Sequence, residues 1–184
     1  MAEIVYNRGI EYEGKNTTVN IEEFRLPRYA QIPDVGLYLE QVVRYVNSHL
    51  AILGEPALTS SMVSNYVKQR LIPGPEKKSY SRDSIAYLLL LSYIKTVMSL
   101  DDIRLMTQVQ RRSYDLETAY DYFCAELENL LRYVCGVSAA PSEIGSTHTE
   151  EKELLRTALL SITYKLYMDL HLKFFREEET QPQT

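Results

Sequence analysis

A short basic segment, residues 59–82, gathers the side chains of this sequence that are best suited to bind a charged polymer. It contains five lysines and arginines and one acid, Glu76, so it carries a charge of +4. The whole chain carries −5 at pH 7, so the remainder carries −9. A basic island in an acidic chain is typical of a phosphate-binding surface. A solvated charged surface is the alternative interpretation.

Polar side chains share one side of a helix predicted over residues 60–70. Val63 and Val67 have the spacing of a buried face, and Ser61, Ser64, Asn65 and Lys68 occupy the opposite side. An asparagine can form two hydrogen bonds with adenine, so Asn65 is the candidate for base reading in a major groove. An ordinary exposed asparagine is the alternative.

The two serines could bind base edges or phosphates, and the remaining candidates are expected to bind phosphates, because they are basic or carry a phenolic hydroxyl group. Lys77 and Lys78 lie in the segment 74–80, which reads as a tight loop or small hairpin, and Tyr80 is expected to anchor that segment in the core. The residues expected to bind DNA are Ser61, Ser64, Asn65, Tyr66, Lys68, Arg70, Lys77, Lys78 and Arg82.

Helical periodicity predicts an all-α protein around this segment. A first helix is predicted over residues 34–53, with Asp34 as its N-cap, and a last helix is predicted to start near Thr149. Thr59, Ser81 and Ser99 are the predicted N-caps of the intervening helices. Residues 1–33 read as an irregular arm with a short extended piece near Ile4–Tyr6.

An apolar seam follows, with spacings of four, three, four, three and four residues. Such a seam packs either on another helix of the same chain or on its copy in a second chain. The residues of the seam, assigned here to dimerisation, are Leu116, Tyr120, Phe123, Leu127, Leu130 and Val134.

The order of features over residues 58–106 resembles the winged helix-turn-helix of MerR-type regulators. A capped helix with a tyrosine is followed by Leu-Ile-Pro at 71–73, a basic loop, Tyr-Ser-Arg-Asp at 80–83 and Met-Ser-Leu-Asp-Asp-Ile at 98–103. The resemblance implies a recognition helix over 60–70, a wing over 74–80 and a homodimer formed by a helix after the winged domain. The sequence departs from that pattern at Ser64-Asn65-Tyr66, where Arg-Tyr-Tyr is usual, and at Arg70, where glycine is usual.

The chain is more closely similar to an uncharacterised bacterial family, catalogued as a domain of unknown function. The similarity rests on the patterns at Leu37–Val42 and Asn65–Lys68 and covers roughly residues 25–130. It supports the fold and adds no biochemical role.

Four segments are expected: the arm at 1–33, a winged helix-turn-helix domain at 34–112, a helical dimerisation or packing region at 113–176, and a disordered tail at 177–184. The predicted function is a cytoplasmic, sequence-specific transcriptional regulator that binds double-stranded DNA as a homodimer. The alternative is a protein-interaction module that keeps the fold without binding DNA.

Other classes of function have little support. The three histidines are scattered, the two cysteines lack metal-ligand spacing, and no glycine-rich phosphate loop is present, so no catalytic residue, metal site or cofactor is expected. No signal peptide is visible, and the apolar run Ile85–Leu91 is too short to span a membrane. The many tyrosines after residue 113 are expected to fill the core, with an aromatic pocket for a small-molecule effector as the alternative.

Overall fold

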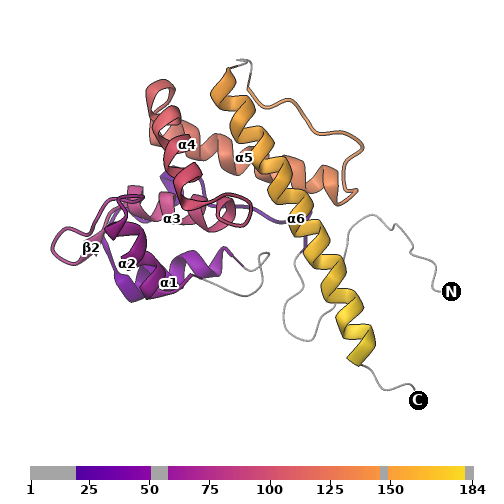
Figure 1. The fold of residues 1–184 in the computed structure, drawn as a ribbon, viewed down its shortest axis with the longest axis horizontal. Helices are drawn as coiled ribbons and strands as arrows, with labels where there is room; N and C mark the ends of the chain where they lie inside the picture. The colour runs from indigo at the N-terminus through magenta and orange to yellow at the C-terminus, as the bar shows by residue number, and fades with distance from the viewer. Residues whose placement is uncertain (1–19, 51–57, 146–148, 181–184) are drawn as a thin grey trace.

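Helices make up most of the computed structural model, which describes residues 20–50, 58–145 and 149–180 (Figure 1). The expectation of a mainly helical protein is confirmed. In chain order the elements are the 3-10 turn η1 (Tyr29–Gln31), β1 (Leu37–Tyr38), α1 (Leu39–Ser48), α2 (Ser60–Lys68), β2 (Ser79–Tyr80), α3 (Arg82–Ile94), α4 (Leu100–Ser113), α5 (Leu116–Val134) and α6 (Glu150–Thr180).

Three helices begin at the predicted caps. The hydroxyl oxygens of Thr59, Ser81 and Ser99 each accept a hydrogen bond from the backbone amide three residues further on, at 3.2, 3.4 and 3.2 Å. These bonds satisfy amide groups that have no partner inside the helix. The three bonds confirm the predicted caps.

The predicted start of the first helix at Asp34 is wrong. Residues 37 and 38 instead form β1, which pairs antiparallel with β2 through Leu37–Tyr80 and Tyr38–Ser79. Gly36 permits this approach, since a Cβ atom there would lie 1.9 Å from Ser79 Oγ. Helix α1 begins only at Leu39, and the predicted end of this helix at residue 53 lies outside the described residues.

Helix α3 lies at the centre of the core. Ten of its thirteen residues are buried, and it packs against α1, α5 and α6. One hydrophobic cluster extends from Ile21 in the arm through α3 to Leu166 in α6. The core therefore continues across residue 112, where two domains were expected to meet.

The apolar seam of α5 faces the inside of the same chain. Tyr120, Phe123, Leu127 and Leu130 are fully buried, with α6 and α3 packed against α5. Leu116 and Val134, at the two ends, are half-buried. The assignment of this seam to dimerisation is therefore corrected, because its central side chains are not accessible to a second chain.

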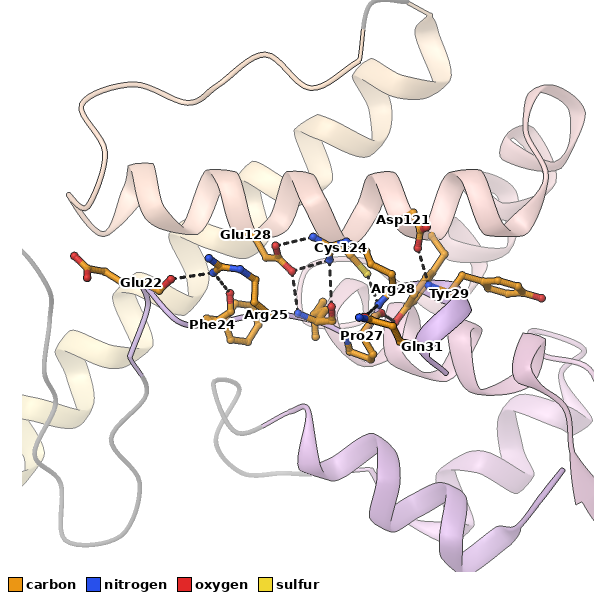
Figure 2. A network of polar contacts seen from close by, with 12 residues as sticks. Glu22, Phe24, Arg25, Pro27, Arg28, Tyr29, Gln31, Asp121, Cys124 and Glu128 are labelled. Atoms are coloured by element: carbon orange, nitrogen blue, oxygen red, sulfur yellow. Dashed lines mark hydrogen bonds and ion pairs between the residues drawn. The ribbon is translucent and has the colours of Figure 1, made fainter. Parts of the chain in front are cut away.

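The arm runs along α5 in the opposite direction to the helix (Figure 2). Arg28 donates two hydrogen bonds to the Glu128 carboxylate, at 2.7 and 2.8 Å, and the Leu26 amide donates a third at 2.9 Å. The Tyr29 amide donates to Asp121 at 2.7 Å, and its hydroxyl donates to Asp83 at the start of α3. The arm thus links α5 to the beginning of α3.

The end of the chain differs in part from the prediction. Residues 177–180 continue α6, where a disordered tail was expected, and residues 181–184 lie outside the described part, as does the extended piece predicted at Ile4–Tyr6. None of the described helices combines the length and apolarity that a membrane crossing requires.

Candidate nucleic-acid interface

Helix α2 has one buried and one exposed face. Val63 and Tyr66 point into the core, whereas Ser61, Ser64, Asn65 and Lys68 are exposed. The exposed set is the one that sequence spacing placed on a shared face, so the structure brings these four residues together. The face combines hydroxyl, amide and ammonium groups, all of which can hydrogen-bond to bases or phosphates.

A hydrogen bond between side chains orients Asn65. Its Oδ1 accepts a hydrogen bond from Gln69 Nε2 at 3.1 Å, one helical turn further on. The pair lies on the exposed surface of α2. Gln69 was not among the candidates, although the four-residue spacing is the signal that could have found it.

The Ser64 hydroxyl already forms a hydrogen bond within α2. Its hydroxyl donates to the backbone carbonyl of Ser60 at 3.0 Å. The hydroxyl oxygen can still accept a hydrogen bond from another group. Ser64 therefore still offers an acceptor on the exposed face of α2.

Tyr66 is not a surface residue, and its assignment as a phosphate contact is corrected. Only 4% of the residue is exposed, and it belongs to the same core cluster as Val63. It lies three positions after Val63, which places both side chains on one face of the helix. Burial raises the pKa of its hydroxyl.

Helix α2 ends in a Schellman motif around Arg70. The Leu71 amide donates to the Tyr66 carbonyl at 3.0 Å, and the Arg70 amide donates to the Val67 carbonyl at 2.9 Å. This closure places Arg70 in the left-handed region, at φ 58°. Glycine is the usual residue in that conformation, because a Cβ atom makes it less favourable by about 1–2 kcal/mol.

A tight turn presents Lys77 and Lys78. Glu76 and Ser79 exchange two backbone hydrogen bonds, at 2.9 and 2.8 Å, so the two lysines form a two-residue hairpin loop. Both have positive φ, 47° and 70°. Positive φ at both positions is typical of a type I′ turn, where Asn-Gly is the preferred pair. Both lysine side chains are exposed.

Arg70, Lys77 and Lys78 therefore share three properties. Each is basic, each is exposed, and each has a backbone conformation that favours glycine or asparagine. They are the non-glycine residues with positive φ in the described parts of the chain. All three lie within the basic segment, at the end of α2 and at the tip of the hairpin.

A known protein family accounts for about half of the chain. A family model described as a domain of unknown function (DUF1836) matches residues 27–123. The chain belongs to the DUF1836 family. No curated protein and no solved structure matches it. The DUF1836 segment begins in the arm and ends in α5, so it includes all of the residues expected to bind DNA.

Within the DUF1836 segment, Arg82 has structural partners that the sequence did not predict. Its Nε donates to the Ile32 carbonyl at 3.0 Å, and its guanidinium lies 5.5 Å from the centre of the Tyr29 ring and 3.6 Å from Asp34. The side chain is half-buried. Arg82 therefore holds the arm against the start of α3, and its assignment as a DNA contact is corrected, because its guanidinium is engaged within the fold.

The DUF1836 segment also contains a basic residue beside α2 that the sequence analysis missed. Arg104, on α4, lies with its Nη2 3.5 Å from the backbone carbonyl of Gln69, at the end of α2. It also forms an ion pair with Asp101. A cation near the last carbonyl groups of a helix is favourable. No local pattern connects residues 69 and 104, which meet only in the folded chain.

Proposed function

We propose that this protein is a sequence-specific DNA-binding regulator of transcription, with a winged helix-turn-helix formed by β1, α1, α2, the hairpin 74–80 and α3. In this proposal, α2 enters the major groove and the hairpin contacts the backbone beside it. Asn65 reads bases, and Lys68, Arg70, Lys77 and Lys78 bind phosphates.

The observation that carries the proposal is the basic identity of the three residues with left-handed backbones. Stability alone favours glycine or asparagine at Arg70, Lys77 and Lys78. A residue in an unfavourable conformation at a functional site is common, because the site needs its side chain. Phosphate binding is such a need, and it accounts for all three residues together.

The short pairing of β1 with β2 supports the same arrangement. It anchors the hairpin next to α1, and Tyr80, which pairs with Leu37, is buried in the core, as expected from the sequence. Gly74 lies against α2, since a Cβ atom there would be 3.3 Å from Val67 Cγ1. The hairpin and α2 are therefore neighbours on one side of the molecule, as a helix and wing that bind together must be.

We further propose a homodimer formed through α6. Tyr164, Met168, Leu172 and Phe175 follow spacings of four, four and three residues, and each is 42–55% exposed. They form an apolar stripe on a helix about 46 Å long that projects beyond the other helices in Figure 1. A second copy of α6 is a fitting partner, because two identical stripes can bury each other. The resulting two-fold symmetric dimer could bind an inverted-repeat DNA site.

The test is binding of a fluorescent pool of random duplex DNA at several salt concentrations. Four phosphate contacts per subunit, doubled in a dimer, predict a slope of about −7 in a plot of log affinity against log salt. Selection of bound sequences from the pool then identifies a site. Absence of salt-dependent binding even at 50 mM salt would rule out the proposal.

A protein-interaction module is the second candidate. The net charge of −5 and the neutral face formed by Ser61, Ser64 and Asn65 favour it. It predicts no binding in the duplex assay. It also predicts that Lys77→Ala with Lys78→Ala leaves every nucleic-acid readout unchanged.

A further inference from the structure

A pocket opens on the side of the core formed by α3, α4, α5 and α6. It has a volume of about 200 Å³ and is partly open to solvent. Its walls are largely apolar and include Leu90, Met106, Val109, Leu116 and Leu155. None of the residues proposed to contact DNA lines it. A ligand in this pocket would therefore not compete directly with DNA for the same residues.

The size and lining of the pocket indicate the shape of a ligand. An apolar cavity of about 150 Å³ is enough to bind benzene. This pocket is somewhat larger, and three tyrosines, Tyr87, Tyr114 and Tyr122, contribute to its walls. Aromatic walls favour flat aromatic ligands, which stack on the rings or meet their edges. One ring or two fused rings fit these dimensions.

Among the polar residues that line the pocket, which also include Gln110 and Glu151, Tyr122 and Lys152 can bind an acceptor group. The Tyr122 hydroxyl is buried and has no hydrogen-bond partner among the described residues. Burial raises its pKa to about 12, so it is a protonated donor at neutral pH. Lys152 lies with Nζ 5.3 Å from the centre of the Tyr122 ring and donates to the Gly145 carbonyl at 3.0 Å. A buried donor and a cation both favour a ligand with an acceptor group.

We propose that this pocket binds a small aromatic molecule of one or two fused rings that carries a single hydrogen-bond-accepting or anionic group. The rings lie between the apolar side chains of α4 and α6, and the acceptor group lies beside Lys152. The site is built entirely from residues of one chain. Its existence does not depend on whether the protein binds DNA.

The experiment measures binding of 2-naphthoate and of indole to the full chain, by calorimetry and by thermal unfolding. Indole is the uncharged probe of similar size. We expect saturable binding of 2-naphthoate, with indole at least tenfold weaker, and a rise in the melting temperature of roughly 5–10 °C at 100 times Kd. Absence of saturable binding of both probes at millimolar concentration would overturn the proposal.

Two neighbouring positions on α4 provide a matched pair of variants. Thr107 lines the pocket, whereas the next residue, Gln108, is exposed and does not. Thr107→Trp fills the pocket and should abolish binding of 2-naphthoate, and Gln108→Trp should leave it unchanged. Binding that survives in folded Thr107→Trp would place the ligand elsewhere and overturn the proposal.

A second variant keeps the test decisive if Thr107→Trp does not fold. Lys152→Met removes the cation at the edge of the pocket. It should weaken binding of 2-naphthoate about tenfold and leave indole unchanged, because only the anion interacts with the ammonium group. Equal affinity of wild type and Lys152→Met for 2-naphthoate would contradict the proposed position of the anionic group and overturn the proposal.

Discussion

The backbone amide of Leu71 donates a hydrogen bond to the carbonyl of Tyr66 at 3.0 Å, and this bond closes α2 around a left-handed Arg70. The chain thus places a long cation where the helix ending favours glycine. Lys77 and Lys78 at the hairpin tip likewise have left-handed backbones that favour glycine or asparagine. Stability and DNA binding should therefore respond in opposite directions to substitutions at these positions.

Arg70→Gly should stabilise the protein and weaken DNA binding. Relief of the left-handed Cβ, reduced by the greater freedom of glycine in the unfolded chain, predicts a gain of about 0.5–1 kcal/mol in the free energy of unfolding. The salt slope should flatten by about 0.9 per subunit. Denaturant unfolding and duplex titration provide the two measurements. Arg70→Ala is the control, because it loses the charge while retaining the strain.

Replacing Lys77-Lys78 with Asn-Gly should also maintain or raise stability while it weakens DNA binding. Asn-Gly is the preferred pair for this turn, so the melting temperature should rise or stay constant. Two phosphate contacts are lost, so the salt slope should flatten by about 1.8 per subunit, to a similar extent for every duplex sequence. A variant that keeps the full wild-type slope would remove the hairpin from the proposed interface.

Asn65→Ala should reduce the preference for the selected site over random DNA by about 1–3 kcal/mol, because a base contact is lost. Gln69→Ala removes only the group that donates to Asn65 Oδ1, so we expect a smaller loss in the same direction. Competition titrations with specific and random duplexes measure both effects. Equal weakening toward all duplexes would indicate that Asn65 contacts phosphate instead.

Arg28→Ala should destabilise the protein by about 3 kcal/mol, because it leaves the Glu128 carboxylate buried without its cation. Arg25→Ala is the matched control on the same arm. Arg25 is exposed, and within the described part of the chain it donates only to the nearby Glu22 and Phe24 carbonyls, so its removal should change stability by less than about 0.5 kcal/mol. Chemical unfolding measures both variants, and similar results for the two would mean that the arm does not stabilise α5.

Met168→Glu should convert the proposed dimer to a monomer without unfolding it, since Met168 is about half exposed. Sedimentation measures the mass, and circular dichroism checks the helices. Gln108→Glu makes the same charge change at an exposed position of α4 and should leave the mass unchanged. A monomeric wild-type protein would contradict the proposed interface directly.

Local chemistry made several features predictable from the sequence. The caps at Thr59, Ser81 and Ser99 depend on a side chain and an amide three residues apart, so a short window contains the whole interaction. The exposed face of α2 follows from helical spacing in the same way. Asp34 satisfied a similar local rule and was still wrong, because pairing of β1 with β2 extended the chain there.

Periodicity identified apolar faces but not their partners. The seam of α5 was correctly seen as apolar, yet only tertiary packing decided that α6 and α3 of the same chain cover it. The location of Tyr66 was ambiguous for a related reason, since a tyrosine can pack its ring in the core or expose its hydroxyl at the surface. The fold directed its ring inward.

The sequence by itself determined the basic segment, the existence of most helices and the caps at Thr59, Ser81 and Ser99, because a cap and a helical face depend on residues a few positions apart. Tertiary structure alone decided the contacts that join distant residues: the Arg28–Glu128 pair, one hundred positions apart, the approach of Arg104 to Gln69, and the pocket between α4 and α6. The left-handed backbones of Arg70, Lys77 and Lys78 were not predicted either, because the helix closure and the two-residue hairpin impose a conformation that these residue types disfavour. The physical reason is that helix packing and strand pairing outweigh the conformational preference of a single residue.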